Sequence, residues 1–159
     1  MNGVCLTGNR PQKIPFSENS RECAELKDRM RRTVTTLIEE GYTRFITGMA
    51  LGSDIWFAEC VLDLKDVYPD LELEAAVPYI GQRDRLAASD RFRYDRVLRE
   101  CSDVKYISDV YSKYCMNKRN RYMVDNSDVV LVINYAESGG TVNTRAYAVK
   151  KKKRIIDLA

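Results

Sequence analysis

The sequence predicts an α/β fold, with a mostly parallel sheet of about six strands and helices on both faces. Short apolar segments alternate along the chain with longer segments whose apolar residues recur every three or four positions. Residues 129–133 are almost purely apolar, as expected for a central parallel strand that is covered on both sides. The 159 residues suffice for one domain with a substantial core. We therefore expect a single Rossmann-like domain over residues 1–159.

The first half of the chain predicts three strands separated by two helices. Residues 4–7, 44–47 and 71–77 are short apolar segments bounded by turn residues. A long helix is expected from Asn19 or Ser20 through Glu40, because its apolar residues are spaced three and four apart and Gly41 can stop it. A second helix is expected over residues 53–66, where Trp56 and Phe57 belong to the core.

The second half continues the same alternation. The predicted helices cover residues 89–100, residues 116–126 and a segment that ends at Lys152, and the predicted strands cover residues 104–107, 129–133 and 155–158. In the first of these helices, Phe92, Val97 and Leu98 form the expected inner face. The basic residues 150–154 suit the end of the last helix, where cations interact favourably with the helix dipole.

The composition excludes several kinds of chemistry. The chain has no histidine, which removes histidine acid–base catalysis and the common zinc sites. Its five cysteines are scattered without a CxxC pair, so we expect reduced thiols and no metal. No membrane span or signal peptide is recognisable, which favours a cytoplasmic protein. The net charge of +3 is too small to establish nucleic acid as a partner, although local basic patches can bind it.

Three loops carry residues that suit a ligand, and each loop follows a predicted strand. Glycine turns before helices leave backbone N–H groups free to bind anions, above all phosphate. The carboxyl ends of parallel strands meet at one edge of a sheet, so the three loops are expected to form one site. The candidate residues are Thr7, Gly8 and Arg10 in the first loop, Gly48, Gly52, Ser53 and Asp54 in the second, and Gly139, Gly140 and Thr141 in the third.

These motifs together resemble the YpsA-like family of the SLOG superfamily. The resemblance covers nearly the whole chain, through TGNRP at residues 7–11, TGMALGSD at residues 47–54, Arg119-Asn120 and the glycine turn at residues 139–141. It implies a Rossmann-like fold, a nucleotide or nucleotide-derived ligand and no cofactor, and it makes a homodimer plausible. The superfamily also includes the LOG phosphoribohydrolases and the DNA-processing protein A family.

The resemblance to the LOG enzymes is closest around Arg119. Met116, Arg119, Met123 and Asp128 match the spacing of their MxxRxxxM motif and the aspartate that follows it. Asn120 replaces the lysine after the motif arginine, and Thr144 stands where the glutamate of GGxGTxxE is expected. A carboxylate stabilises the positive charge that develops on ribose when an N-glycosidic bond breaks, and Thr144 cannot supply one.

Asp54 and Glu59 are the carboxylates that could replace the missing glutamate, and Arg119 would hold phosphate or assist catalysis. Each has a plainer interpretation: Asp54 as a helix N-cap, Glu59 as a surface residue and Arg119 as a solvated residue of a basic run. Asn120 and Thr144 stand at these motif positions and are further ligand-binding candidates. Tyr79, Tyr111 and Tyr114 lie in predicted loops and are candidates for stacking on a base.

Three functions remain open from the sequence. The leading hypothesis is a protein that binds a nucleotide or a phosphorylated ribose derivative at the carboxyl edge of the sheet. The second is a LOG-like N-glycosidase that acts on a nucleotide. The third is a single-stranded DNA-binding or adaptor module, which requires a basic face with stacking aromatic residues.

Overall fold

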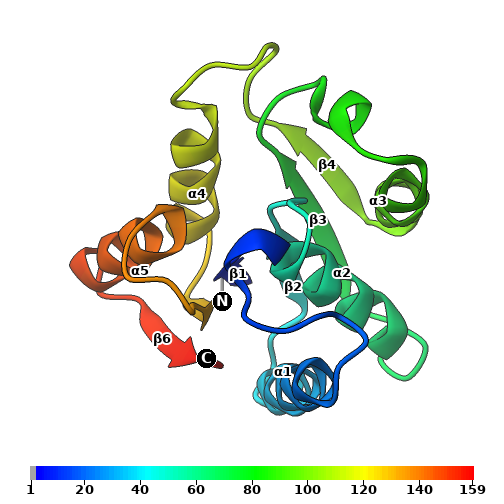
Figure 1. Cartoon of the computed structure of the whole chain (residues 1–159). Coiled ribbons are helices and arrows are strands. Elements are labelled where there is room, and N and C mark those ends of the chain that lie inside the picture. Colours follow the sequence, from blue (N-terminus) through cyan, green and yellow to red (C-terminus); the bar gives the residue numbers. More distant parts are fainter. Residues whose placement is uncertain (1–2) are drawn as a thin grey trace.

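The computed structural model describes residues 3–159, which form a single α/β domain around one parallel sheet (Figure 1). The strand order is β4-β3-β2-β1-β5-β6, and all neighbouring strands in it pair in parallel. This confirms the predicted fold class. The strands are β1 (Val4–Gly8), β2 (Arg44–Thr47), β3 (Glu72–Val77), β4 (Asp103–Tyr106), β5 (Val129–Ile133) and β6 (Arg154–Asp157).

Five α-helices and two short 3₁₀ segments connect the strands within the described residues. The helices are α1 (Arg21–Glu39), α2 (Ser53–Leu64), α3 (Ala88–Glu100), α4 (Cys115–Asp125) and α5 (Gly140–Lys150), and the 3₁₀ segments are η1 (Pro11–Lys13) and η2 (Gln82–Arg85). Each predicted helix and strand is present. Their ends differ from the predicted ends by no more than two residues. No helix within residues 3–159 is long and apolar enough to cross a membrane.

Successive strand residues supply two separate cores, one on each face of the sheet. In β1, Val4 and Leu6 belong to the core beneath α1, α2 and α3, whereas Cys5 belongs to the core beneath α4 and α5. This follows from the two-residue period of a strand, which directs neighbouring side chains to opposite faces. Figure 1 shows α4 and α5 on one side of the sheet and α1, α2 and α3 on the other.

The position of β1 determines where a ligand can bind. β1 lies between β2 and β5, so the chain proceeds to one side of β1 in its first half and to the other side in its second half. The connections that leave β1 and β5 therefore diverge to opposite faces of the sheet at its carboxyl edge. Ligands of open α/β sheets bind in the crevice that forms at such a switch point.

The predicted inner face of α3 is wrong in one residue. Phe92 is 76% exposed, whereas Tyr94 is buried, and its hydroxyl donates a hydrogen bond to Gln82 Oε1 at 2.9 Å. Two residues correspond to about 200° of rotation around a helix, so both side chains cannot face the core. The helix is rich in arginine and has few apolar residues, so the sequence pattern alone does not identify its inner face. Trp56 and Phe57 of α2 are buried, as predicted.

An ion-pair cluster links α3 to α2 and to the segment before α1. Arg93 on α3 donates hydrogen bonds to Glu18 at 2.8 Å and to Glu59 on α2 at 2.5–3.0 Å. Lys27 on α1 adds a contact to Glu18 at 2.7 Å. Hydrogen bonds from Arg93, with a further contribution from Lys27, hold the pKa of Glu18 at about 2, below its ordinary value of 4.5. Glu18 therefore stabilises the folded state in its ionised form.

The depressed pKa of Glu18 predicts a pH-dependent loss of stability. Its contribution is complete above pH 4.5 and is lost as the pH falls toward 2, because the folded state then has to accept a proton that it binds weakly. In thermal melts between pH 3 and pH 7, Glu18→Gln should lower the melting temperature most at pH 7 and less at pH 3. Glu25→Gln, which removes the exposed pair with Arg21, is the matched control and should have little effect at any pH. An equal effect of Glu18→Gln across this range would contradict the assignment.

Candidate functional site

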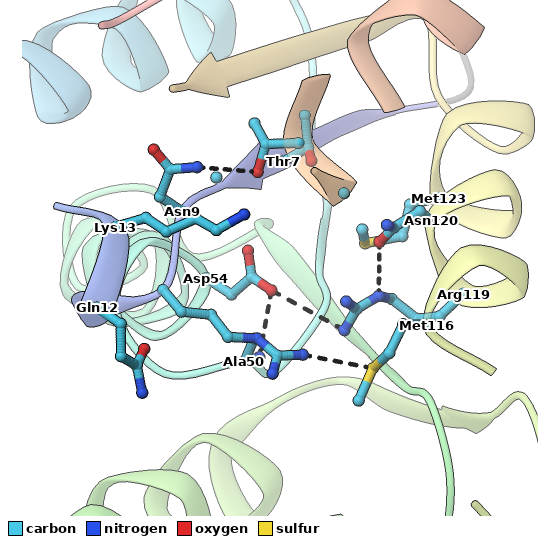
Figure 2. A pocket seen from close by; sticks show the side chains of 14 residues that line it. Thr7, Asn9, Gln12, Lys13, Ala50, Asp54, Met116, Arg119, Asn120 and Met123 are labelled. Atoms are coloured by element: carbon cyan, nitrogen blue, oxygen red, sulfur yellow. Dashed lines mark hydrogen bonds and ion pairs between the residues drawn. The ribbon is translucent and has the colours of Figure 1, made fainter. Parts of the chain in front are cut away.

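A pocket of about 350 Å³ lies at the carboxyl ends of the central strands, and we call it the switch-point pocket. Residues from the β1 loop, the β2–α2 loop, α4 and the start of α5 line it (Figure 2). The lining residues are Thr7, Gly8, Asn9, Arg10, Gln12, Lys13, Ala50, Asp54, Met116, Arg119, Asn120, Met123, Gly140 and Thr141. Elements far apart in the sequence therefore meet at the edge that the sequence predicted.

A buried ion pair joins two walls of the switch-point pocket. Arg119 on α4 and Asp54 on α2 are only 5% and 4% exposed, and Arg119 Nη1 lies 4.0 Å from Asp54 Oδ2. Figure 2 shows the two side chains entering from opposite walls and meeting. Arg119 also donates hydrogen bonds to the Gly48 carbonyl and, at 2.8 Å, to Asn120 Oδ1. Asp54 Oδ2 accepts the Ala50 N–H at 3.2 Å, so both charged groups have further polar partners.

Burial dominates the electrostatics of this pair. Loss of hydration raises the pKa of Asp54, and the nearby Arg119 guanidinium offsets part of that rise. Burial lowers the pKa of Arg119, with Asp54 acting in the opposite direction. A guanidinium remains protonated at neutral pH even after such a shift. The pair therefore places a buried guanidinium and a carboxyl group side by side at the cavity.

Asn9 connects the loop after β1 to the loop after β5. Its side-chain oxygen accepts the Tyr135 N–H at 2.6 Å, and its side-chain nitrogen donates to Asn134 at 3.2 Å and to Thr141 Oγ1 at 3.4 Å. Its carbonyl accepts the Ser53 hydroxyl at 2.8 Å. One residue thus positions the starts of α2 and α5 relative to β1. Asn9 is 4% exposed, as a positioning residue of this kind should be.

The start of α5 and Lys13 form the wall best suited to an anion. Gly139 caps α5 with a φ of 120° and no side-chain hydrogen bond, so the first N–H groups of the helix have no side-chain cap. Gly140 and Thr141 of this first turn line the pocket. Lys13 reaches across from η1 to the Ser138 carbonyl at 3.3 Å, and Figure 2 shows its side chain extending over the pocket. The combination of orphan N–H groups, the helix dipole and an ammonium favours phosphate.

The structure brings together eight of the predicted site residues. They line the switch-point pocket and are Thr7, Gly8, Arg10, Asp54, Arg119, Asn120, Gly140 and Thr141. Four others support its walls from behind. Gly48 accepts the hydrogen bond from Arg119, Ser53 donates to Asn9, Gly52 packs against Pro11 with a φ of 81°, and Gly139 ends the loop before α5.

Glu59 and Thr144 lie away from the pocket lining. Glu59 faces Arg93 in the ion-pair cluster between α2 and α3, in the groove beside α3. Thr144 donates its hydroxyl to the Gly140 carbonyl of its own helix at 2.7 Å and lines a separate groove with residues of α4. Asp54 is therefore the one carboxylate among the residues that line the switch-point pocket.

Several residues that line the pocket were not predicted from the sequence. Asn9 lies between the predicted site residues Gly8 and Arg10, and an asparagine in a loop after a strand indicates a residue that can hydrogen-bond nearby backbone groups. Gln12, Lys13 and Ala50 carry no such signal, because their places depend on η1 and on the turn around Met49. Met49 adopts a φ of 64°, a conformation that non-glycine residues rarely adopt.

No group of three potential metal ligands of the His, Cys, Asp or Glu type occurs in the described part of the chain. The five cysteines are free thiols, of which Cys5, Cys23 and Cys115 are buried. Burial raises the pKa of Cys5 and of Cys60 to about 12, so these thiols are poor nucleophiles at neutral pH. The switch-point pocket offers hydrogen-bond donors, cations and one carboxylate for chemistry.

Comparison with known proteins identifies related sequences and folds. The model of the YpsA family, described as the YspA SLOG family, matches residues 4–157. UPF0398 proteins from Bacillus thuringiensis (strain Al Hakam) and Bacillus cereus (strain Q1) are each 27% identical over 158 residues, covering 98% of this chain and 86% of theirs.

Two solved structures of DNA processing protein A share the fold. The protein from Streptococcus pneumoniae aligns with a TM-score of 0.65 at 14% identity, and that from Helicobacter pylori with a TM-score of 0.67 at 19% identity. Each alignment covers 98% of this chain, but only 49% and 64% of the two longer chains. The Helicobacter pylori structure describes how that protein binds single-stranded DNA.

The close approach of Gly48 to the ion pair predicts that this position tolerates only glycine. A Cβ atom there would lie 2.8 Å from both Arg119 Nη1 and Asp54 Oδ2, so the buried pair would have to move. Gly48→Ala should lower the free energy of unfolding by about 1–3 kcal/mol, the usual cost of overpacking. Denaturant unfolding measures this. Gly81→Ala is the matched control, because its nearest neighbour would be 3.7 Å away; equal stability of the two variants would contradict the contact.

Proposed function

This chain belongs to the YspA SLOG family, and on that premise we propose that it binds a phosphorylated ribose or a nucleotide in the switch-point pocket. The observation that carries the proposal is the convergence of a helix N-terminus, two exposed cations and a buried arginine on one cavity. Gly140, Thr141 and Lys13 would hold the phosphate. Asp54 would accept hydrogen bonds from ribose hydroxyl groups, and the Asn120 side-chain nitrogen would donate hydrogen bonds to them.

The exposed cations give the site its affinity for anions. Arg10 and Lys13 are solvent-exposed and have no salt-bridge partner within the described residues, whereas Arg119 already faces Asp54. Arg10 makes one weak contact, from its guanidinium to Met116 Sδ at 3.6 Å. Lys13 makes one long hydrogen bond, to the Ser138 carbonyl at 3.3 Å. Both side chains can therefore exchange a weak contact for a phosphate, which is the property expected of a binding residue on a loop.

Binding without hydrolysis is the better-supported activity. The glutamate position of the LOG motif is occupied by Thr144, which lies outside the pocket lining. Asp54 is the carboxylate that remains, and one of its oxygens already accepts the Ala50 N–H and faces Arg119. A carboxylate that is already engaged by Arg119 and the Ala50 N–H is better suited to accepting a hydrogen bond from a ribose hydroxyl than to taking a proton from water.

Calorimetric titration with ribose 5-phosphate and nucleoside 5′-monophosphates tests the proposal. Arg10→Gln and Lys13→Gln should each weaken binding by about 10- to 100-fold, since a charge-assisted hydrogen bond contributes about 1.5–3 kcal/mol. Arg99→Gln, an exposed cation on α3, is the matched control and should bind as the wild type does. Chromatography of the same mixtures should show no released base. Failure of the wild type to bind any of these phosphates would refute the proposal.

A single-stranded DNA-binding function is the second candidate, and a separate groove favours it. This groove, which we call the tyrosine groove, runs between α4 and α5, and no carboxylate lines it. Lys113 lies 5.1 Å from the Tyr114 ring centre, and Arg121 lies 5.0 Å from that of Tyr147. Cations interleaved with aromatic rings are the features that bind single strands without sequence preference. The similarity to DNA processing protein A points the same way.

The tyrosine groove predicts salt-dependent binding of an oligonucleotide. Fluorescence anisotropy with a labelled oligothymidylate should show affinity that falls steeply between about 50 and 200 mM salt. The double variant Lys113→Gln/Arg121→Gln should reduce the magnitude of the slope of log K against log[salt] by about 1.4, or about 0.7 for each lost phosphate contact. Arg99→Gln again serves as the control. Binding that is insensitive to salt, or equally strong in the double variant, would count against this function.

A further inference from the structure

A second cavity continues from the switch-point pocket along the carboxyl edge of the sheet, and we call it the aromatic pocket. Its volume is about 310 Å³. It shares Arg10, Gln12, Ala50 and Met116 with the switch-point pocket, so the two cavities adjoin along this boundary. Arg10 and Met116 are in contact at this boundary at 3.6 Å, so a ligand that extends from one cavity into the other would displace their side chains. The far wall of the aromatic pocket comes from the segments that follow β3 and β4.

Two tyrosine rings and a guanidinium form that far wall. Tyr79 and Tyr111 meet edge to face, with ring centres 5.3 Å apart and planes at 80°. The Arg85 guanidinium lies 4.9 Å from the centre of the Tyr111 ring and 5.8 Å from that of Tyr79. Tyr79 is buried, whereas Tyr111 is about half exposed. The pocket thus presents a buried ring, a half-exposed ring and a flat cation, each of which stacks well on another planar group.

The charges and polar groups of the aromatic pocket narrow the choice of ligand. No carboxylate lines the pocket, and Arg85 forms no ion pair within residues 3–159. Gln82 is buried and accepts the Tyr94 hydroxyl through its side-chain oxygen, which leaves its amide N–H groups as donors. A flat ring with hydrogen-bond acceptors and no positive charge fits these features. A sugar fits them less well, because it offers no π face to Tyr111 or Arg85.

We infer that the aromatic pocket is the subsite for a heteroaromatic base, and that the ligand class is therefore nucleotides rather than simple sugar phosphates. This inference rests on the proposed function, since the phosphorylated ribose would occupy the switch-point pocket. Arg10 and Met116 lie at the boundary, where the ribose would pass from one cavity to the other. Tyr111 stacks on the base, Arg85 packs against the same ring system, and Gln82 donates to the edge of the base.

Comparison of ligands with and without a base tests this assignment. Calorimetry on the full chain would use ribose 5-phosphate and the monophosphates of adenosine, guanosine, cytidine and uridine. At least one nucleotide should bind about tenfold more tightly than ribose 5-phosphate, as expected for one stacked base. Tyr111→Ala should abolish that preference without changing the affinity for ribose 5-phosphate. Tyr111→Phe should retain both, and Phe92→Ala, which removes an exposed aromatic ring on α3 away from both pockets, is the matched control.

The outcomes separate the inference from the function on which it rests. If wild-type protein binds ribose 5-phosphate and all four nucleotides equally, or if Tyr111→Ala weakens both kinds of ligand alike, the base subsite is refuted and the phosphate site stands. If wild-type protein binds none of the five compounds, the proposed function fails and the inference fails with it. Thermal melts of each variant establish that a loss of binding does not reflect unfolding; Tyr111 is 51% exposed, so its truncation should leave the fold intact.

Discussion

The contact between Arg119 and Asp54 is the interaction on which the geometry of the site depends. α2 and α4 cover opposite faces of the sheet, and this pair joins them over its carboxyl edge. Burying two charges is costly, and the cost is offset only when each has further hydrogen-bond partners. Here the Gly48 carbonyl, the Asn120 side chain and the Ala50 N–H provide them. The width of the pocket is therefore fixed by a network that tolerates little displacement.

In this site, one set of residues positions the walls and another set attracts an anion. The buried residues Arg119, Asp54 and Asn9 are held by the protein itself, and they define where the walls stand. The exposed cations Arg10 and Lys13 remain available to a ligand. This division is physically reasonable, because a buried charge cannot reorganise cheaply, whereas a long exposed side chain can adapt to its partner. A change in the buried set should alter stability first, and a change in the exposed set should alter affinity first.

The sequence was sufficient to predict the order of the elements and the edge of the sheet where the pocket lies. Alternating periodicity specifies strands and helices, and parallel connections bring the loops after β1, β2 and β5 to one edge. The orientation of individual side chains was less predictable. Gly48 and Ser53 were expected to face the ligand, but the structure uses them to hold Arg119 and Asn9. A residue type reveals which bonds it can form, yet the partner it takes is decided by tertiary packing. The same limit applies to Glu59, whose partner Arg93 follows it by 34 residues and lies on a different helix.

Met116 lies where three cavities at the carboxyl edge of the sheet meet. It lines the switch-point pocket, the aromatic pocket and the tyrosine groove. A mononucleotide would extend from the switch-point pocket past Met116 toward Tyr111, whereas a single strand would extend past the same residue toward Tyr114 and Tyr147. Methionine is flexible and polarizable, so one side chain can form part of either path. Asn120 and Gly140 also line both the switch-point pocket and the tyrosine groove, so the two ligands, bound as proposed, would compete for the same wall.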